Sequence, residues 1–385
     1  MRDNREDIQR LSSDLYSMRG IGILLVVVVH VLGVDATHGV RKLFAADRTD
    51  LRVVVELLHS FNMAVMLMGS GVAVAAFGRA DLSLFDFMRK KVNKLLVPML
   101  VWAPVLFLMQ ELTRGAVHGR EGWLSVLLRM PTTWFPAYSI FWFVHALVGC
   151  TLMAWLFRKY AASALGRWSG AVYFGLAVLL HLLAIPWSDS SNVGGYVEMI
   201  LSWNRFFGLG LLVYPLLPAV RQAIARWPVA LQALLPTAFF ALIVLIYAVF
   251  PEELYPVVCG LNGPLGFGML FSLIVFLRQR VSEGGAAWKE AWSRLVFTGS
   301  ISMTLYLFHI YFVSGMRIAL ERLHPGMPLA VHFVLGCLAG CVGPWLLFQA
   351  FKGLPLFHWS VGLTLRVPRV RAPEGQPAEG LAQTP

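Results

Sequence analysis

Residues 19–30 read RGIGILLVVVVH, in which ten residues without a charge or a proline join an arginine to a histidine. Eleven helical steps of 100° make three full turns and roughly 20° more, so both side chains lie on one face of a helix. They stand roughly 16 Å apart along its axis, which places Arg19 near one membrane surface and His30 about half a bilayer deeper. Ionisable groups inside hydrocarbon are costly and usually mark a functional path. This segment therefore predicts a membrane helix that carries a functional stripe.

Apolar segments long enough to cross a bilayer, about 20 residues, recur along nearly the whole chain of 385 residues. Hydrophobic residues make up 58% of the sequence and charged residues only 14%, which is typical of polytopic helical membrane proteins and not of soluble domains. We expect an all-α integral membrane helical bundle of about ten transmembrane helices. The expected spans lie near residues 20–36, 54–76, 95–111, 138–157, 170–187, 196–218, 229–250, 257–277, 296–320 and 329–351.

Lysine and arginine gather in alternate connections between the expected spans. The connection before the third span carries Arg79, Arg89, Lys90, Lys91 and Lys94, whereas the later connections on the opposite side carry almost none. Because basic residues concentrate on the cytosolic side, this asymmetry predicts a multi-pass protein of the plasma (inner) membrane with both termini cytosolic. The net charge of +11 is then largely a topology signal, with some attraction to anionic lipid, and it does not indicate nucleic-acid binding.

The expected organisation is one membrane domain with two short extensions. Residues 1–13 are expected to be a cytosolic N-terminal segment and residues 14–351 the membrane domain. Residues 352–385 are expected to be a largely disordered cytosolic tail, because proline, alanine, glycine and glutamate are frequent near its end. All four cysteines fall within expected spans without zinc-ligand spacing, so no metal site is expected.

Charged residues at helical spacing mark two further places. Lys91 and Lys94 are three residues apart at the entrance of the third span, so they share a face and could hold phosphate oxygens together. The simpler explanation is anchoring at the cytosolic surface. Glu198 and Arg205 in the sixth span are seven residues apart, about two turns, and face the same side. A buried, purely structural ion pair would have this spacing.

A polar stripe marks the ninth span, where Ser302, Tyr306 and His309 follow one another at i, i+4 and i+7. Such a stripe faces the bundle interior and not lipid, where it either joins neighbouring helices by hydrogen bonds or takes part in chemistry. In the fourth span, Trp142 and Phe143 offer an aromatic platform for a substrate or an ordinary helix contact.

These features together resemble the integral-membrane acyltransferases of acyltransferase family 3. The resemblance covers roughly residues 14–351, and the double lysine departs from the arginines usual in that family. The resembling elements, in chain order, are DLYSMRG at 14–20 followed by His30, FNM at 61–63 with Ser70 and Gly71, KVNKLLVP at 91–98, Trp142 with Phe143, and Ser302 with Tyr306 to His309.

The resemblance implies transfer of an acyl group, commonly acetyl from acetyl-CoA, to a hydroxyl of a cell-surface or exported polysaccharide or of its lipid-linked precursor. It implies no bound cofactor, with acyl-CoA as the donor substrate. Arg19, Lys91 and Lys94 would hold the anionic end of the donor, and the neutral imidazole of His30 would act as general base. Direct transfer and an acyl-histidine intermediate are both open.

The ninth span is expected to complete that reaction centre. His309 would approach His30 from the opposite wall, with Ser302 and Tyr306 contacting the acceptor and Trp142 nearby as an apolar platform.

The alternative function is a transporter or flippase for lipid-linked glycans or small anions, in which Arg19 and His30 line a polar path. The expected spans lack the paired, glycine- or proline-broken helices typical of transporter repeats, which favours the enzyme. Glycosyltransferases of the same pathway are expected partners of the enzyme but not required by the transporter.

Overall fold

The computed structural model describes residues 2–44, 48–114, 122–188 and 192–363; most residues in these ranges are helical and none of them forms a strand. Ten helical segments in the described ranges are long and apolar enough to cross a membrane. The expected all-α bundle of about ten membrane-spanning helices is therefore confirmed.

The helices that supply these segments, together with the shorter ones between them, follow each other along the chain as α1 (Arg2–Leu32), α2 (Thr49–Phe77), α3 (Leu84–Lys91), α4 (Val97–Arg114), α5 (Gly122–Arg129), α6 (Trp142–Tyr160), α7 (Ala162–Leu165), α8 (Ser169–Ala184), α9 (Asn192–Val213), α10 (Leu217–Ala225), α11 (Val229–Val249), α12 (Tyr255–Glu283), α13 (Ala286–Ser300), α14 (Ser302–Leu323), α15 (Leu329–Phe351) and α16 (Pro355–Ser360). A π-helical turn, η2 (Val92–Leu96), joins α3 to α4.

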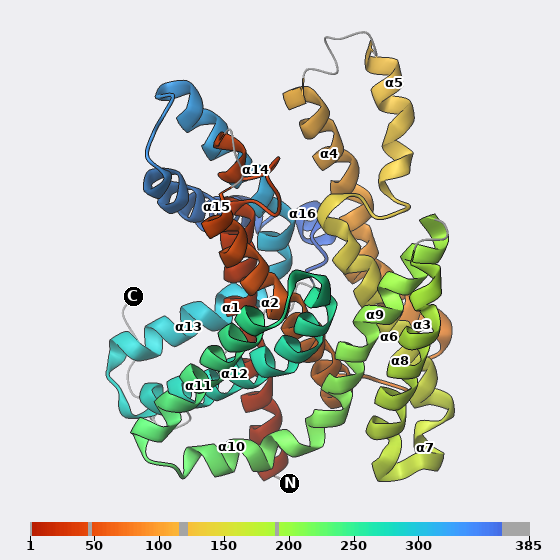
Figure 1. Cartoon of the computed structure of the whole chain (residues 1–385). Coiled ribbons are helices and arrows are strands. Elements are labelled where there is room, and N and C mark those ends of the chain that lie inside the picture. The colour runs from red at the N-terminus through yellow and green to blue at the C-terminus, as the bar shows by residue number, and fades with distance from the viewer. Residues whose placement is uncertain (1, 45–47, 115–121, 189–191, 364–385) are drawn as a thin grey trace, which may run out of the picture.

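Helix α1 runs through the centre of the bundle, where it packs against α2, α12, α13, α14 and α15 (Figure 1). The apolar stretches of α1 and α2 are the most buried of the ten spans, and those of α8 and α11 are the least buried. All of the ten spans are apolar, so the buried fraction of a span depends on its position in the bundle and not on its hydropathy. The stripe of Arg19 and His30 is thus carried by a central helix.

The first span begins earlier than the sequence predicts, because α1 is helical from Arg2 onward. Other helices contact its polar first turns. Asp14 is 1% exposed, and its carboxylate accepts a 2.6 Å hydrogen bond from Arg221 and pairs with Arg278. The residues before Arg19 in the candidate span Ile8–Leu32 include Gln9, Arg10 and Asp14, so Arg19 still lies at the polar start of this span and His30 lies close to its other end.

The expected ninth span, 296–320, is broken at Ile301, where α13 ends and α14 begins. In Figure 1, α13 lies across the bundle and α14 runs along it. Glycines bring α13 against α1: a Cβ on Gly299 would stand 1.7 Å from the carbonyl oxygen of Tyr16, and one on Gly20 would stand 2.7 Å from that of Leu295. Small residues permit this backbone approach, which places the break beside Arg19.

The folded part of the chain continues past the expected domain end at residue 351. Residues 355–360 form α16, which packs against α4, and Phe357, His358, Ser360 and Val361 are buried. The rest of the expected tail, residues 364–385, lies outside the described residues.

Candidate active site

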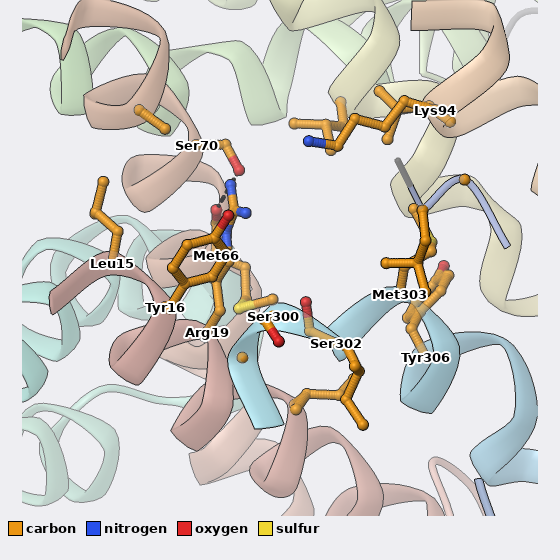
Figure 2. A pocket seen from close by; sticks show the side chains of 18 of the residues that line it. Leu15, Tyr16, Arg19, Met66, Ser70, Lys94, Ser300, Ser302, Met303 and Tyr306 are labelled. Carbon is orange, nitrogen blue, oxygen red and sulfur yellow. Dashed lines mark hydrogen bonds between the residues drawn. The ribbon is translucent and has the colours of Figure 1, made fainter. Parts of the chain in front are cut away.

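A cavity of about 560 Å³ opens between α1, α2, η2, α6, α14 and the segment after α15. It is lined by Arg19, Lys91 and Lys94, the three cations predicted to bind the donor, and by Ser302 and Tyr306 of the ninth span. In Figure 2, Arg19 lies at the left of the cavity, Lys94 at its upper right, and the Ser302 hydroxyl points into it from below. The structure thus brings together residues that are up to 287 positions apart in the sequence, from 19 to 306.

The Arg19 side chain projects from α1 into this cavity, and it forms no hydrogen bond or ion pair with any described residue (Figure 2). A guanidinium carries five N–H donors in a planar fork that matches carboxylate and phosphate oxygens. Leaving all of them unused inside a bundle is costly. An anion entering the cavity would satisfy them.

The two lysines reach the same cavity from the π-helical turn η2 and the residue before it. In such a turn the backbone bonds reach one residue further than in an α-helix, and these turns frequently mark functional sites. Lys91 directly precedes η2 and Lys94 lies within it. The Lys91 ammonium also lies 5.6 Å from the centroid of the Phe87 ring. Two cations from neighbouring turns of the chain thus line one cavity.

The charge of the cavity has one sign. Arg19 repels both Lys91 and Lys94, and none of the described residues that line the cavity is acidic. Uncompensated like charges that lie close together raise the free energy of the empty protein. The cavity is therefore suited to an anionic ligand with an apolar portion, since methionine, leucine and phenylalanine side chains cover much of the remaining wall.

The two histidines predicted to be catalytic are in contact. The ring centroids of His30 and His309 lie 4.8 Å apart, with the rings at 78°. His309 is 0% exposed and His30 is half-buried. The predicted meeting of these residues from two walls is thus present in the geometry, and their roles stay predictions.

Backbone carbonyls set the tautomer of both rings. The Nδ1 of His30 lies 2.9 Å from the Val26 oxygen, and the Nδ1 of His309 lies 2.8 Å from that of Tyr306. A carbonyl oxygen only accepts, so each Nδ1 carries the proton and each Nε2 keeps a free lone pair. The Nε2 of His309 has no partner among the described residues. On each imidazole, Nε2 is thus the nitrogen that can accept a proton.

The histidine pair lies just beyond the end of the cavity that is formed by Val26 and Tyr306. Val26 and Tyr306 line the cavity, and their carbonyl oxygens hold His30 and His309 respectively. The histidines themselves do not line it. The distance along α1 and α14 is about one helical turn, roughly 5 Å.

The remaining predicted residues have different surroundings. The hydroxyl of Tyr306 donates to the carbonyl of Ile140. This hydrogen bond fixes α14, and the hydroxyl proton is not available to the acceptor substrate. Trp142 does not line the cavity: its ring lies 5.1 Å from that of Trp203, which supports the helix-contact explanation. Its neighbour Phe143 lines the cavity instead.

The predicted direct ion pair between Glu198 and Arg205 is replaced by a bridged arrangement. His181 of α8 lies between them, with its Nδ1 3.6 Å from the Glu198 carboxylate and its Nε2 3.1 Å from the Arg205 guanidinium. Sequence spacing could not reveal this bridge because His181 belongs to another helix. The cluster joins α8 to α9 outside the cavity.

Some lining residues were not assigned a role by the sequence. Ser70 lines the cavity, and its hydroxyl donates to the Met66 carbonyl at 2.8 Å. His358 and Gly362 line it from beyond the last span, and the only sequence signal there is the aromatic run around His358 in an otherwise tail-like stretch.

Comparison with known proteins gives one match. A family model described as an acyltransferase domain matches residues 13–349. No curated protein and no solved structure matches the chain.

Proposed function

The chain belongs to acyltransferase family 3 and is a membrane acyltransferase, and on this premise we propose that it moves an acyl group, acetyl in the simplest case, from acyl-CoA to a hydroxyl of a cell-surface or exported polysaccharide or its lipid-linked precursor. The observation that carries the proposal is a cavity whose described lining has three cationic and no acidic side chains. It ends about one helical turn from two histidines whose Nε2 atoms keep a free lone pair. Under the predicted orientation the cations face a cytosolic donor.

The cavity suits the donor by its charge and by its apolar wall. The phosphates of CoA would contact Arg19, Lys91 and Lys94 through charge-assisted hydrogen bonds. The pantetheine arm would follow the apolar wall formed by Ile23, Val26 and other lining residues. The thioester would then arrive at the inner end of the cavity, beside the histidine pair.

The proposed reaction uses one base. The Nε2 of His30 removes the proton of the acceptor hydroxyl, the resulting oxygen attacks the thioester carbonyl, and the carbon–sulfur bond breaks. The proton held by His30 then passes to the CoA thiolate, which leaves as thiol. An acyl-histidine intermediate would use the same lone pair for attack, with the acceptor entering in a second step.

The proposed function is tested by mass spectrometry of cell-surface and exported polysaccharide from cells with and without the gene. Loss of an acyl group, restored by the wild-type gene but not by a His30→Gln variant, is the expected result. An unchanged acyl content combined with loss of glycan export would instead identify the alternative transporter function.

Removing the cavity cations should weaken donor binding. Arg19→Ala, and separately the double variant Lys91→Ala with Lys94→Ala, should each raise the Kd for CoA about 10-fold or more, since a hydrogen bond to a charged group contributes about 1.5–3 kcal/mol. The dependence of rate on acceptor concentration should stay unchanged, because these residues contact the donor alone. Calorimetry on purified protein measures the affinity.

A matched control replaces exposed basic residues outside the cavity. Arg294 and Lys289 of α13 do not line it, and their alanine variants should bind CoA as the wild type does. Wild-type affinity in both cation variants of the cavity would contradict the assigned donor site.

A further inference from the structure

The chain after the last membrane helix folds back onto the bundle and does not leave it. The indole Nε1 of Trp102 in α4 donates a 3.0 Å hydrogen bond to the carbonyl of Ser360, and the ring of Phe357 stacks 6.3 Å from that of Phe308 in α14. These contacts hold α16 against α4 and α14. As a result, His358, Gly362 and Leu363 form part of the cavity wall.

The end of this segment contacts the backbone of Lys94, one of the cations assigned to the acyl donor. Gly362 has φ 66°, a left-handed conformation that favours glycine, and a Cβ there would stand 2.2 Å from the carbonyl oxygen of Lys94. Only a residue without a side chain permits this approach. The position of residues 355–363 and the position of Lys94 are therefore coupled through direct contact.

His358 lines the cavity and carries a hydrogen-bond acceptor that no described residue uses. Its Nε2 contacts the carbonyl of Lys352, which only accepts, so Nε2 carries the proton and Nδ1 carries a lone pair. His358 is 8% exposed, and its Nδ1 is buried without a partner among the described residues. A buried acceptor without a hydrogen bond destabilises the empty site, so a ligand that donates to it gains affinity.

We propose that residues 355–363 complete the donor site and that the Nδ1 of His358 accepts a hydrogen bond from an N–H or O–H group of the acyl-CoA, close to the phosphates at Lys94. This inference rests on the proposed use of acyl-CoA. The contact comes from outside residues 13–349, the part matched by the family model, so it belongs to the C-terminal segment of this chain.

The test measures CoA binding and initial rates with the purified full-length protein. His358→Phe keeps an aromatic ring and removes both the Nδ1 acceptor and the Nε2–H donor to Lys352, and it should raise the Kd and the KM for the donor about 5- to 10-fold with little change in kcat. His358→Asn loses the same contact with Lys352, so the difference between the two variants reports the acceptor alone. His358→Asn places an amide oxygen near the former Nδ1 and should recover most of that loss. Gly362→Ala should raise the Kd similarly by pushing the segment away from Lys94.

Trp359→Phe is the matched control, because Trp359 belongs to the same helix but is 49% exposed and does not line the cavity. It should bind CoA as the wild type does. Wild-type affinity in both His358→Phe and Gly362→Ala would overturn the inference and leave the proposed function standing. Equal losses in His358→Phe and His358→Asn would overturn the hydrogen bond. A wild-type protein that does not bind CoA would overturn the proposed function and this inference together.

Discussion

Replacing His30 with glutamine is expected to reduce acyl transfer about 100-fold or more, since a general base contributes about 10²–10⁴-fold to the rate. Glutamine is similar in length and polarity, so the helix should stay packed, but its amide cannot accept the proton of an acceptor hydroxyl. The Nδ1 of His30 is bound to the Val26 carbonyl, and Nε2 is the atom whose loss matters. The measurement is the rate of acyl transfer per mole of protein in the membrane.

The control for His30 is another histidine in a membrane helix. His332 of α15 is 4% exposed and does not line the cavity, so His332→Gln should keep close to wild-type activity. Protein level and thermal unfolding midpoint should match in both variants. If His30→Gln keeps more than about a tenth of the activity, general-base catalysis is the wrong role for this residue.

Removal of the His309 lone pair should lower kcat about 10- to 100-fold. A hydrogen bond to a charged group contributes about 1.5–3 kcal/mol, which corresponds to a change of this size. When His30 takes up a proton, the ring 4.8 Å away offers the free Nε2 of His309 to the developing positive charge or to the bound acceptor. His309→Asn keeps a donor for the Leu305 and Tyr306 carbonyls that bind Nδ1, but removes Nε2. Turnover at saturating donor measures the effect.

Two readouts separate this role from a purely structural one. CoA affinity and thermal unfolding of His309→Asn should remain at the wild-type level, because the backbone contacts and the donor cavity are preserved. A variant that loses stability and activity in parallel would show that His309 only packs α14 against α1. In that case the lone pair has no part in turnover.

The sequence predicted the spans and the polar stripes well, because both depend on local helix geometry. Ten apolar segments, the shared face of Arg19 and His30 and the shared face of Tyr306 and His309 follow from a rise of 1.5 Å and a turn of 100° per residue. It was less successful at ends and breaks. Near the polar start of α1, Asp14 pairs with Arg221 and Arg278, and beside the break at Ile301, Gly299 packs on Tyr16. These partners are remote in the sequence, so no local pattern shows them.

By itself, the sequence determined that this protein is a helical membrane acyltransferase with ionisable groups on identified helix faces, since each helix forms its own backbone hydrogen bonds in an apolar medium. The family resemblance led to the expectation that His30 meets His309 and that Arg19, Lys91 and Lys94 share a donor site, but only the tertiary structure decided which faces meet. The contact of His30 with His309, the gathering of Arg19, Lys91 and Lys94 around one cavity, the bridge of His181 and the return of α16 all depend on packing between helices. That packing is a sum of small contacts across the whole bundle, and periodicity within one helix does not contain it.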